Sequence, residues 1–235
     1  MTGRTTPGEG RPRDGRLARR LLTLGVLGVA WLAFDANLGS RRVSRAREAN
    51  LRTRIRSIHQ SNPILPGETV FLGDSITFDG DWEASFSDLG ARNRGIGWDT
   101  TADVLARLDE SLDGPPANVV LMIGTNDLII NVPHAQTVRN VAHILDHIDE
   151  AAPDTRIIVQ SVLPRTDRYH PLVAPLNEAL SRICNERDLE FIDHTERFAG
   201  SNGLLDPALH DDGLHPNGEG HQILVDALQP LLYRT

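Results

Sequence analysis

Short apolar runs alternate with longer amphipathic stretches along the chain from Thr69 onward. The apolar runs predict β-strands at residues 70–72, 91–94, 119–123, 157–161 and 190–192. The amphipathic stretches predict helices near residues 101–111, 138–151, 173–186 and 218–232. Strands that alternate with helices at this spacing are typical of a parallel sheet covered on both faces. The sequence therefore predicts one α/β domain, and the chain of 235 residues is long enough for a sizeable core.

Polar residues directly follow several of the predicted strands. The first apolar run breaks at Gly73 and is followed by Asp74 and Ser75, and the third is followed by the stretch GTND, which contains Asn126. The second ends in RGIGWDTT, where Thr100 or Thr101 is expected to cap the next helix. In an open α/β sheet the carboxyl edge of the strands is where ligands bind. We therefore expect a site at this edge.

The stretch DDGLHPNGEGH near the end of the chain supplies the groups that such a serine needs. A serine hydroxyl becomes an effective nucleophile when a base takes its proton, and the base needs a neighbour that holds its tautomer. Asp212 lies three residues before His215, so its carboxylate can reach Nδ1 and leave Nε2 facing outward. The neutral side-chain amide of Asn126 is suited to stabilising an oxyanion. Together these residues indicate a hydrolytic site.

Four motifs, GDSIT, RGIGWDTT, GTND and DGLHP, resemble in order the four sequence blocks of the SGNH or GDSL-type hydrolases. They look most similar to the branch that includes the platelet-activating-factor acetylhydrolase-like esterases, and the resemblance spans about residues 69–232. It implies a three-layer α/β/α sandwich similar to flavodoxin, with a mostly parallel five-stranded sheet. It also implies that Ser75 is the nucleophile, His215 the general base and acid, and Asp212 the acid that orients His215.

The resemblance further implies an oxyanion hole made by the Ser75 backbone N–H, the Asn126 side chain and a backbone N–H of the second block, at Trp98. The family usually has Gly directly before the Asp of that block, whereas this sequence has Trp98 before Asp99. Trp98 keeps a backbone N–H, since only Pro lacks one. A positive φ at this position would cost a bulky residue about 1 kcal/mol or more. We expect the indole to lie over the acyl pocket.

Several other polar residues near these motifs have alternative interpretations. Zinc binding near His215 remains an alternative, because His and carboxylate side chains are zinc ligands, although it would not explain the serine and asparagine blocks. The residues concerned are His210, Asp211 and His221. The resemblance implies no metal and no cofactor. Three further acids, Asp74, Asp99 and Asp127, are expected to bond loop backbone N–H groups rather than to react.

The activity expected from these residues is hydrolysis of short O-acyl esters, such as acetyl groups on a carbohydrate or a lipid, through an acyl-enzyme. Four residues after the fourth predicted strand either recognise a polar or anionic leaving group or form a solvated loop: Arg165, Arg168, Tyr169 and His170. Two alternatives remain open. One is an O-acyltransferase that uses the same three residues, and the other is a catalytically weak, membrane-tethered binding module.

A hydrophobic segment near the start of the chain predicts membrane attachment. Residues 21–34 carry no charge and follow Arg16, Arg19 and Arg20, which is the pattern of a secretory signal or a short anchor, with a buried core helix as the alternative. Phe34 stands two places before Ala36 and fits signal cleavage poorly, so we favour an uncleaved anchor. The catalytic domain is then expected outside the cytoplasm, either membrane-anchored or secreted.

Charge divides the chain into two parts. Residues 1–56 contain 13 Arg and 4 acidic residues, a net charge of +9, and the remainder carries −17, which gives the overall −8. The acidic part argues against a nucleic-acid groove, because phosphate contacts need a basic surface. We divide the chain into a basic arm and hydrophobic segment (1–40), an Arg-rich linker helix (41–66) and a hydrolase domain (67–235). The linker helix either lies on anionic lipid headgroups or is solvated. Cys184, the single cysteine, excludes an internal disulfide framework, and nothing indicates the oligomeric state.

Overall fold

The computed structural model describes residues 49–234. The chain divides into two compact units, Met1–Leu51 and Arg52–Thr235, and of the first unit only the helical residues 49–51 are described. The predicted hydrophobic segment at 21–34 therefore lies outside the described residues. Within residues 49–234 we find no helix with the length and apolar character that crossing a membrane requires.

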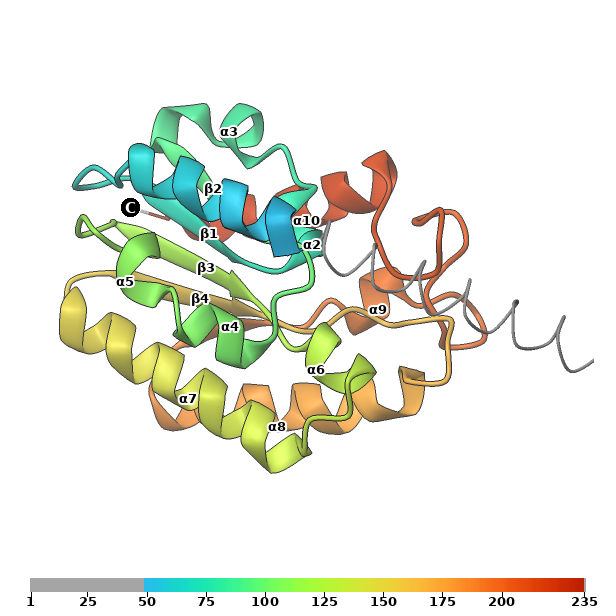
Figure 1. Cartoon of the computed structure of the whole chain (residues 1–235). Helices are drawn as coiled ribbons and strands as arrows, with labels where there is room; N and C mark the ends of the chain where they lie inside the picture. Colours follow the sequence, from blue (N-terminus) through green and yellow to red (C-terminus); the bar gives the residue numbers. More distant parts are fainter. Residues whose placement is uncertain (1–48, 235) are drawn as a thin grey trace, which may run out of the picture. The chain divides into compact units, whose positions relative to one another are not determined.

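The second unit is built on a parallel sheet of five strands in the order β2-β1-β3-β4-β5 (Figure 1). The strands are β1 (Thr69–Gly73), β2 (Ala91–Gly95), β3 (Asn118–Met122), β4 (Arg156–Gln160) and β5 (Glu190–Ile192). β1 pairs with β2 on one side and with β3 on the other, so the strand order reverses next to β1. Such a reversal leaves a crevice at the carboxyl ends of the strands, where ligands bind.

Helices of very different length connect the strands. The long ones are α7 (His134–Ala151), α8 (Val173–Glu186) and α10 (Gly218–Leu232). The short ones are α2 (Ser75–Phe78), α3 (Trp82–Ser85), α4 (Thr101–Leu105), α5 (Leu108–Ser111), α6 (Thr125–Ile129) and α9 (Thr195–Phe198), with 3₁₀ turns η1 (Ser87–Leu89) and η2 (His170–Leu172). Residues 52–61 are also helical and precede β1.

Two hydrophobic clusters lie on opposite faces of the sheet. Because side chains alternate along a strand, Leu72 and Leu121 pack on one face with side chains of α4, α7 and α8. Phe71 and Val120 pack on the other face with side chains of α3, α9 and α10. Figure 1 shows α7 and α8 below the sheet and α3 above it. The predicted three-layer α/β/α fold is confirmed, and all five strands lie where the apolar runs predict them.

The predicted continuous helix at residues 101–111 is wrong. The structure has two short helices there, α4 and α5, which are separated at Ala106 and Arg107. Arg107 leaves the helical conformation, with φ −124° and ψ 14°, and its side chain turns into the interior. A buried guanidinium must find acceptors. Those acceptors, described below, explain why the helix breaks at this residue.

Residues 52–61 of the predicted linker helix lie against the hydrolase domain. Ile55 and His59 are buried, and the guanidinium groups of Arg52 and Arg56 pair with acidic side chains of the β2–α5 region. These ion pairs bind the helix to the domain itself, which neither of the two predicted environments of the linker, solvent or lipid headgroups, includes. This helix therefore packs as part of the second unit, although the predicted domain begins at residue 67.

His194 makes the stability of this fold depend on pH. The side chain is fully buried between β5 and α9, Nε2 hydrogen-bonds Gln160 Oε1 over 2.9 Å, and Nδ1 has no partner among the described residues. Burial lowers the pKa of His194 to about 4, helped by Arg197. Because the folded state holds its proton less tightly than the unfolded state, stability from His194 is present above pH 6.5 and is lost as the pH falls towards 4.

We therefore expect the unfolding free energy of the wild type, relative to His194→Gln, to fall by about 2 kcal/mol between pH 7.5 and pH 5. Urea unfolding of both proteins at each pH measures this difference. The comparison cancels the contributions of other groups, such as Asp74. A difference that does not change with pH would mean that His194 is protonated equally in both states.

Candidate active site

Ser75 lies at the point where β1 ends and α2 begins. Gly73 makes this turn possible, because a Cβ there would lie 2.2 Å from both the Met122 carbonyl oxygen and Thr77 Oγ1. The Asp74 carboxylate then caps α2 by accepting a hydrogen bond from the Ile76 N–H, 3.0 Å away. The strand, the tight turn and the cap together fix Ser75 at the carboxyl edge of the sheet.

His215 and Asp212 meet Ser75 there in a chain of two hydrogen bonds. Ser75 Oγ lies 2.9 Å from His215 Nε2, and His215 Nδ1 lies 2.6 Å from Asp212 Oδ2. Ser75 and His215 are 140 residues apart in sequence. With Asp212 accepting from Nδ1–H, Nε2 carries a lone pair that can accept a proton from Ser75. The structure thus brings together the three residues that the sequence pattern indicates.

The loop before α10 holds His215 in place. His210 Nδ1 accepts a hydrogen bond from the Gly213 N–H over 2.7 Å, and the Thr166 N–H donates to the Gly213 carbonyl over 3.3 Å. At the end of the loop, Asn217 caps α10 by accepting from two backbone N–H groups, and its own amide donates to Ala208. These contacts restrict the loop on both sides of His215.

The residues of the alternative zinc site point to different partners. His210 Nδ1 is used by Gly213, and the His221 ring packs edge-on against Trp82 with ring centroids 4.7 Å apart. No three His, Cys, Asp or Glu side chains gather in a metal-binding arrangement within the part of the chain that the structure describes. We therefore do not propose His210, Asp211 and His221 as a metal site.

Asp212 is held as an anion next to His215. Partial burial raises the pKa of its carboxyl, but the N–H of His215, the imidazole of His215 and the N–H of Leu214 lower it more strongly, to about 2. Hydrogen bonds to the charged form of an acid favour that form. Asp212 is therefore ionised at neutral pH and can stabilise an imidazolium on His215.

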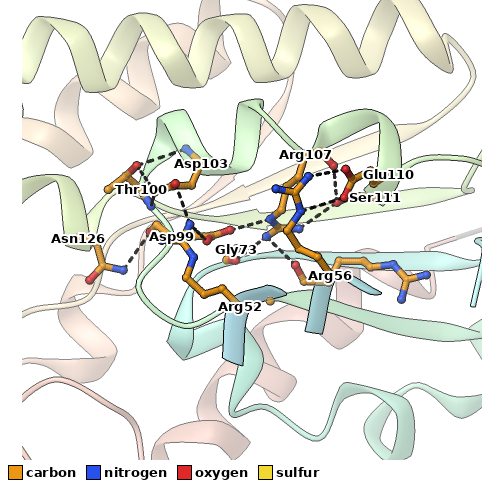
Figure 2. Close-up of polar contacts among 12 residues, drawn as sticks. Arg52, Arg56, Gly73, Asp99, Thr100, Asp103, Arg107, Glu110, Ser111 and Asn126 are labelled. Carbon is orange, nitrogen blue, oxygen red and sulfur yellow. Dashed lines mark hydrogen bonds and ion pairs between the residues drawn. The ribbon is translucent and has the colours of Figure 1, made fainter. Parts of the chain in front are cut away.

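Asn126 lies at the end of β3, in the first turn of α6, and is buried. Its Nδ2 donates to the Asp99 carbonyl over 3.0 Å (Figure 2). An amide NH₂ has two hydrogens, so one remains for another acceptor. The Asp99 carbonyl thereby fixes the plane of the Asn126 amide.

Trp98 adopts the conformation that the glycine of the family suggests, with φ 66°. A bulky residue takes this left-handed conformation at a cost of about 1 kcal/mol or more. Trp98 is 50% exposed, and the neighbouring Gly97 lies close enough to Ser75 that a Cβ on it would be 4.0 Å from Ser75 Cβ. The N–H groups of Ser75 and Trp98 donate to no acceptor among residues 49–234, so both are free to bind a ligand.

Two arginines hold the Asp99 carboxylate, which is fully buried (Figure 2). Arg107 Nε donates to Oδ2 and Arg52 Nη2 donates to Oδ1, each over 2.6 Å. The buried Arg107 also donates to the carbonyls of Gly73 and Arg94 and to Ser111. Sequence reasoning missed both arginines. Arg107 was detectable in principle, because it interrupts the inward stripe formed by Val104 and Leu108, but nothing in the sequence marks Arg52.

The other acids behave largely as expected. Asp127 accepts from the Thr101 N–H over 2.9 Å and from the Thr101 hydroxyl over 2.6 Å, which joins α6 to α4. Asp74 accepts the Ile76 N–H, and burial raises the pKa of Asp74 to about 7. Asp99 differs, because its carboxylate binds guanidinium groups rather than backbone N–H groups.

The segment after β4 is fixed by internal hydrogen bonds and is not an open loop lined by free arginines. Arg165 is buried, and it donates to Asp167 and, over 2.5 Å, to Thr125 Oγ1, beside Asn126. Its guanidinium is therefore occupied. Arg168 is exposed and donates to the Tyr169 hydroxyl over 2.7 Å, whereas Tyr169 is partly buried and its hydroxyl donates to the Ile129 carbonyl over 3.1 Å.

Comparison with known proteins identifies the family. Residues 71–223 match the GDSL-like Lipase/Acylhydrolase family, and this span includes Ser75, Asn126, Asp212 and His215. The chain belongs to this family. This GDSL-like hydrolase is 32% identical over 183 residues to platelet-activating factor acetylhydrolase IB subunit alpha1 of Bos taurus, covering 71% of this chain and 75% of that protein. It is also 32% identical over 181 residues to the alpha2 subunit of Homo sapiens, covering 70% and 76%.

Solved structures share the fold of this GDSL-like hydrolase. A GDSL-like lipase from Bacteroides thetaiotaomicron aligns with a TM-score of 0.68 and 24% identity, covering 76% of this chain and 96% of that one. An acetylxylan esterase from Geobacillus stearothermophilus aligns with a TM-score of 0.59 and 22% identity, covering 73% and 97%. At these identities the two structures support the fold alone.

Proposed function

We propose that this GDSL-like hydrolase is a serine esterase that removes short acyl groups, with acetyl preferred, from a carbohydrate or lipid ester through an acyl-enzyme on Ser75. The observation that carries the proposal is the chain of hydrogen bonds from Ser75 Oγ through His215 to Asp212. A serine that a base and an anion hold in this way is prepared to attack a carbonyl carbon.

In the first step, Ser75 Oγ attacks the ester carbonyl carbon while His215 Nε2 takes the hydroxyl proton. The carbonyl oxygen becomes an oxyanion, and Asp212 stabilises the imidazolium. When the tetrahedral intermediate collapses, the bond to the leaving alkoxide breaks and His215 returns the proton to it. The products of this step are an alcohol and an ester on Ser75.

In the second step, water takes the place of the alcohol. His215 Nε2 accepts a proton from the water as its oxygen attacks the acyl carbon, and it then returns that proton to Ser75 Oγ as the acid departs. His215 and Asp212 are partly exposed to solvent, so water has access to the imidazole. If an alcohol replaces water in this step, the same residues transfer the acyl group.

The proposed oxyanion hole consists of the N–H groups of Ser75 and Trp98 and the second amide hydrogen of Asn126. The two backbone N–H groups have no acceptor among the described residues, and the Asp99 carbonyl orients the Asn126 amide. Donors that are fixed before the reaction stabilise developing charge without reorganisation. This arrangement supports chemistry on a carbonyl group.

The name of one relative supports a short acyl group. The Bos taurus relative is called an acetylhydrolase, and this name refers to acetyl esters. Trp98 replaces the small residue usual in the family and directly follows Gly97, which lies close to Ser75, so we expect the indole to reduce the space next to the nucleophile.

Steady-state hydrolysis of nitrophenyl acetate by the full chain tests the proposed activity. We expect release of nitrophenol that persists in excess chelator. Capture of the acetyl group by an added alcohol in preference to water would instead support acyl transfer. No turnover of any short ester would contradict the proposal and favour the binding module.

Trp98→Gly tests whether the indole limits the acyl chain. An extra methylene in a pocket changes discrimination by about 1–3 kcal/mol, so a pocket that Trp98 restricts gives a steep fall in kcat/KM between two and eight carbons. We expect Trp98→Gly to flatten this fall and to keep acetyl hydrolysis within about tenfold of the wild type. A series of nitrophenyl esters measures it.

Ile58→Ala, which removes an exposed apolar side chain from another element, is the control. If strain at Trp98 instead displaces its N–H, Trp98→Gly will raise kcat by the same factor for esters of every acyl chain length. A profile unchanged in both shape and height would place Trp98 outside the site.

Membrane attachment through residues 21–34 and an extracytoplasmic catalytic domain stay predictions. The pattern of arginines before an uncharged segment is what supports them.

A further inference from the structure

We infer that Arg52, on the helix that precedes β1, is a positioning residue that holds the Trp98–Asp99 segment in the geometry required for oxyanion binding. The inference rests on the proposed esterase function. Arg52 itself touches neither Ser75 nor His215 in the structure.

Arg52 binds the loop between β2 and α4 at two points. Its Nη2 lies 2.6 Å from Asp99 Oδ1 and 2.7 Å from Asp103 Oδ1 (Figure 2). Asp103 belongs to the capping box of α4, in which its carboxylate accepts from the Thr100 N–H over 3.0 Å. One guanidinium nitrogen thus joins the residue after Trp98 to the start of the helix that follows.

The Asp99 main chain connects this ion pair to both proposed oxyanion donors. The Asp99 carbonyl accepts from Asn126 Nδ2 over 3.0 Å, so a displacement of Asp99 turns the Asn126 amide. The Asp99 nitrogen forms the peptide bond with Trp98, and it donates to the Ile96 carbonyl over 3.2 Å. A shift of the Asp99 carboxylate is therefore passed to two of the three donors.

The loop needs such a restraint because Trp98 is strained. A non-glycine residue at φ 66° keeps this conformation when its surroundings hold it there. Arg107 holds Asp99 from the interior through Oδ2, and Arg52 holds it from the helix at residues 52–61 through Oδ1. Burial raises the pKa of Asp99, and both guanidinium groups oppose that rise. Without Arg52, Asp99 keeps one of its two cationic partners.

Arg56 provides a matched control on the same helix. It lies one turn after Arg52 and pairs with Glu110 in α5, without contacting Asp99. The two arginine side chains are similarly exposed, 31% for Arg52 and 41% for Arg56. Arg52→Gln removes the ion pairs with Asp99 and Asp103, and Arg56→Gln removes the ion pair with Glu110. Both variants thus weaken the contact between this helix and the rest of the domain, but only Arg52→Gln releases Asp99.

The experiment compares kcat, KM and Tm of the full-length wild type, Arg52→Gln, Arg52→Lys and Arg56→Gln with nitrophenyl acetate. We expect Arg52→Gln to lower kcat about tenfold with little change in KM, which is less than the ~100-fold loss of a whole oxyanion donor. Arg56→Gln should keep kcat within about twofold, because it leaves the oxyanion donors in place. Arg52→Lys, which keeps the charge, should restore most of the lost kcat, and both Gln variants should remain folded at the assay temperature, which their Tm values check.

Equal kcat values in Arg52→Gln and Arg56→Gln, or equal losses in Arg52→Lys and Arg52→Gln, would overturn the role of Arg52. The activity of the wild type shows whether a negative result contradicts the role of Arg52 or the proposed esterase function. An active wild type with equal variants contradicts the inference alone, whereas an inactive wild type contradicts the proposed function.

Discussion

Ser75→Ala and His215→Ala are each expected to lower kcat for nitrophenyl acetate by at least about 10³-fold. Ser75→Ala removes the atom that we propose attacks the carbonyl, and His215→Ala removes the only base that the structure places within 3 Å of it among the described residues. Because the residues act as a unit, the double variant should lose no more than about tenfold beyond the worse single variant. Steady-state kinetics of the purified proteins measures both losses.

The controls are Ser201→Ala and His143→Ala, which remove exposed side chains elsewhere. Tm should change little in all four single variants, because neither Ser75 nor His215 is a buried core residue. Hydrolysis by Ser75→Ala at a rate near that of the wild type would end the proposed mechanism. If both the Tm and the activity of a variant fell strongly, the loss of activity would instead come from loss of the fold.

Asn126→Ala is expected to give the second largest effect, a loss of about 10²–10³-fold in kcat with a small change in KM. The Asn126 amide is buried and already oriented by the Asp99 carbonyl, so its remaining hydrogen is available to an oxyanion at no cost of reorganisation. Such a donor acts mainly on the transition state, which is why kcat should fall rather than substrate binding.

Asn140→Ala is the matched control for Asn126→Ala. Asn140 is also a buried asparagine, and it bonds Thr101 Oγ1 in the neighbouring helix without contacting any proposed site residue. We expect its kcat to stay close to that of the wild type, even if its Tm falls. Equal losses of kcat in the two variants would show that the effect comes from packing around α4 and not from an oxyanion donor.

The strands and the edge that carries the site were predictable because their causes are local. Residues 119–122 lie within β3, which is buried on both faces and so requires a continuous apolar run. The polar residues at 125–127 have no place inside the sheet. The contact between Asp212 and His215 was predictable for the same reason, since the two residues stand three positions apart in one loop. The meeting of His215 with Ser75 is not local, because 140 residues separate them, and it was predicted from the chemistry that a serine nucleophile needs together with the family resemblance.

The contacts that hold the Trp98–Asp99 segment were not predictable from the sequence, because they are tertiary contacts between residues far apart in the chain. Arg52 and Asp99 are 47 residues apart, and an arginine-rich helix reads as a solvated or lipid-binding element unless its partners are known. Arg107 breaks a helix whose pattern was otherwise continuous, and its buried guanidinium then reaches acceptors on Asp99, Ser111 and the carbonyls of Gly73 and Arg94. These acceptors come from other parts of the fold, so the local sequence does not show them. The short helices α2 and α6, of four and five residues, are too short to show a periodic pattern.

The central claim is that Ser75 is the nucleophile of an esterase, and the most direct test is to map the adduct of a fluorophosphonate probe by mass spectrometry. The probe phosphonylates an activated serine with loss of fluoride, so the mass added to the protein locates the nucleophile. We predict one adduct per chain, on the peptide that contains Ser75, and none in Ser75→Ala or after acid unfolding. An adduct on another residue, or an unlabelled wild type that hydrolyses acetyl esters, would contradict the account.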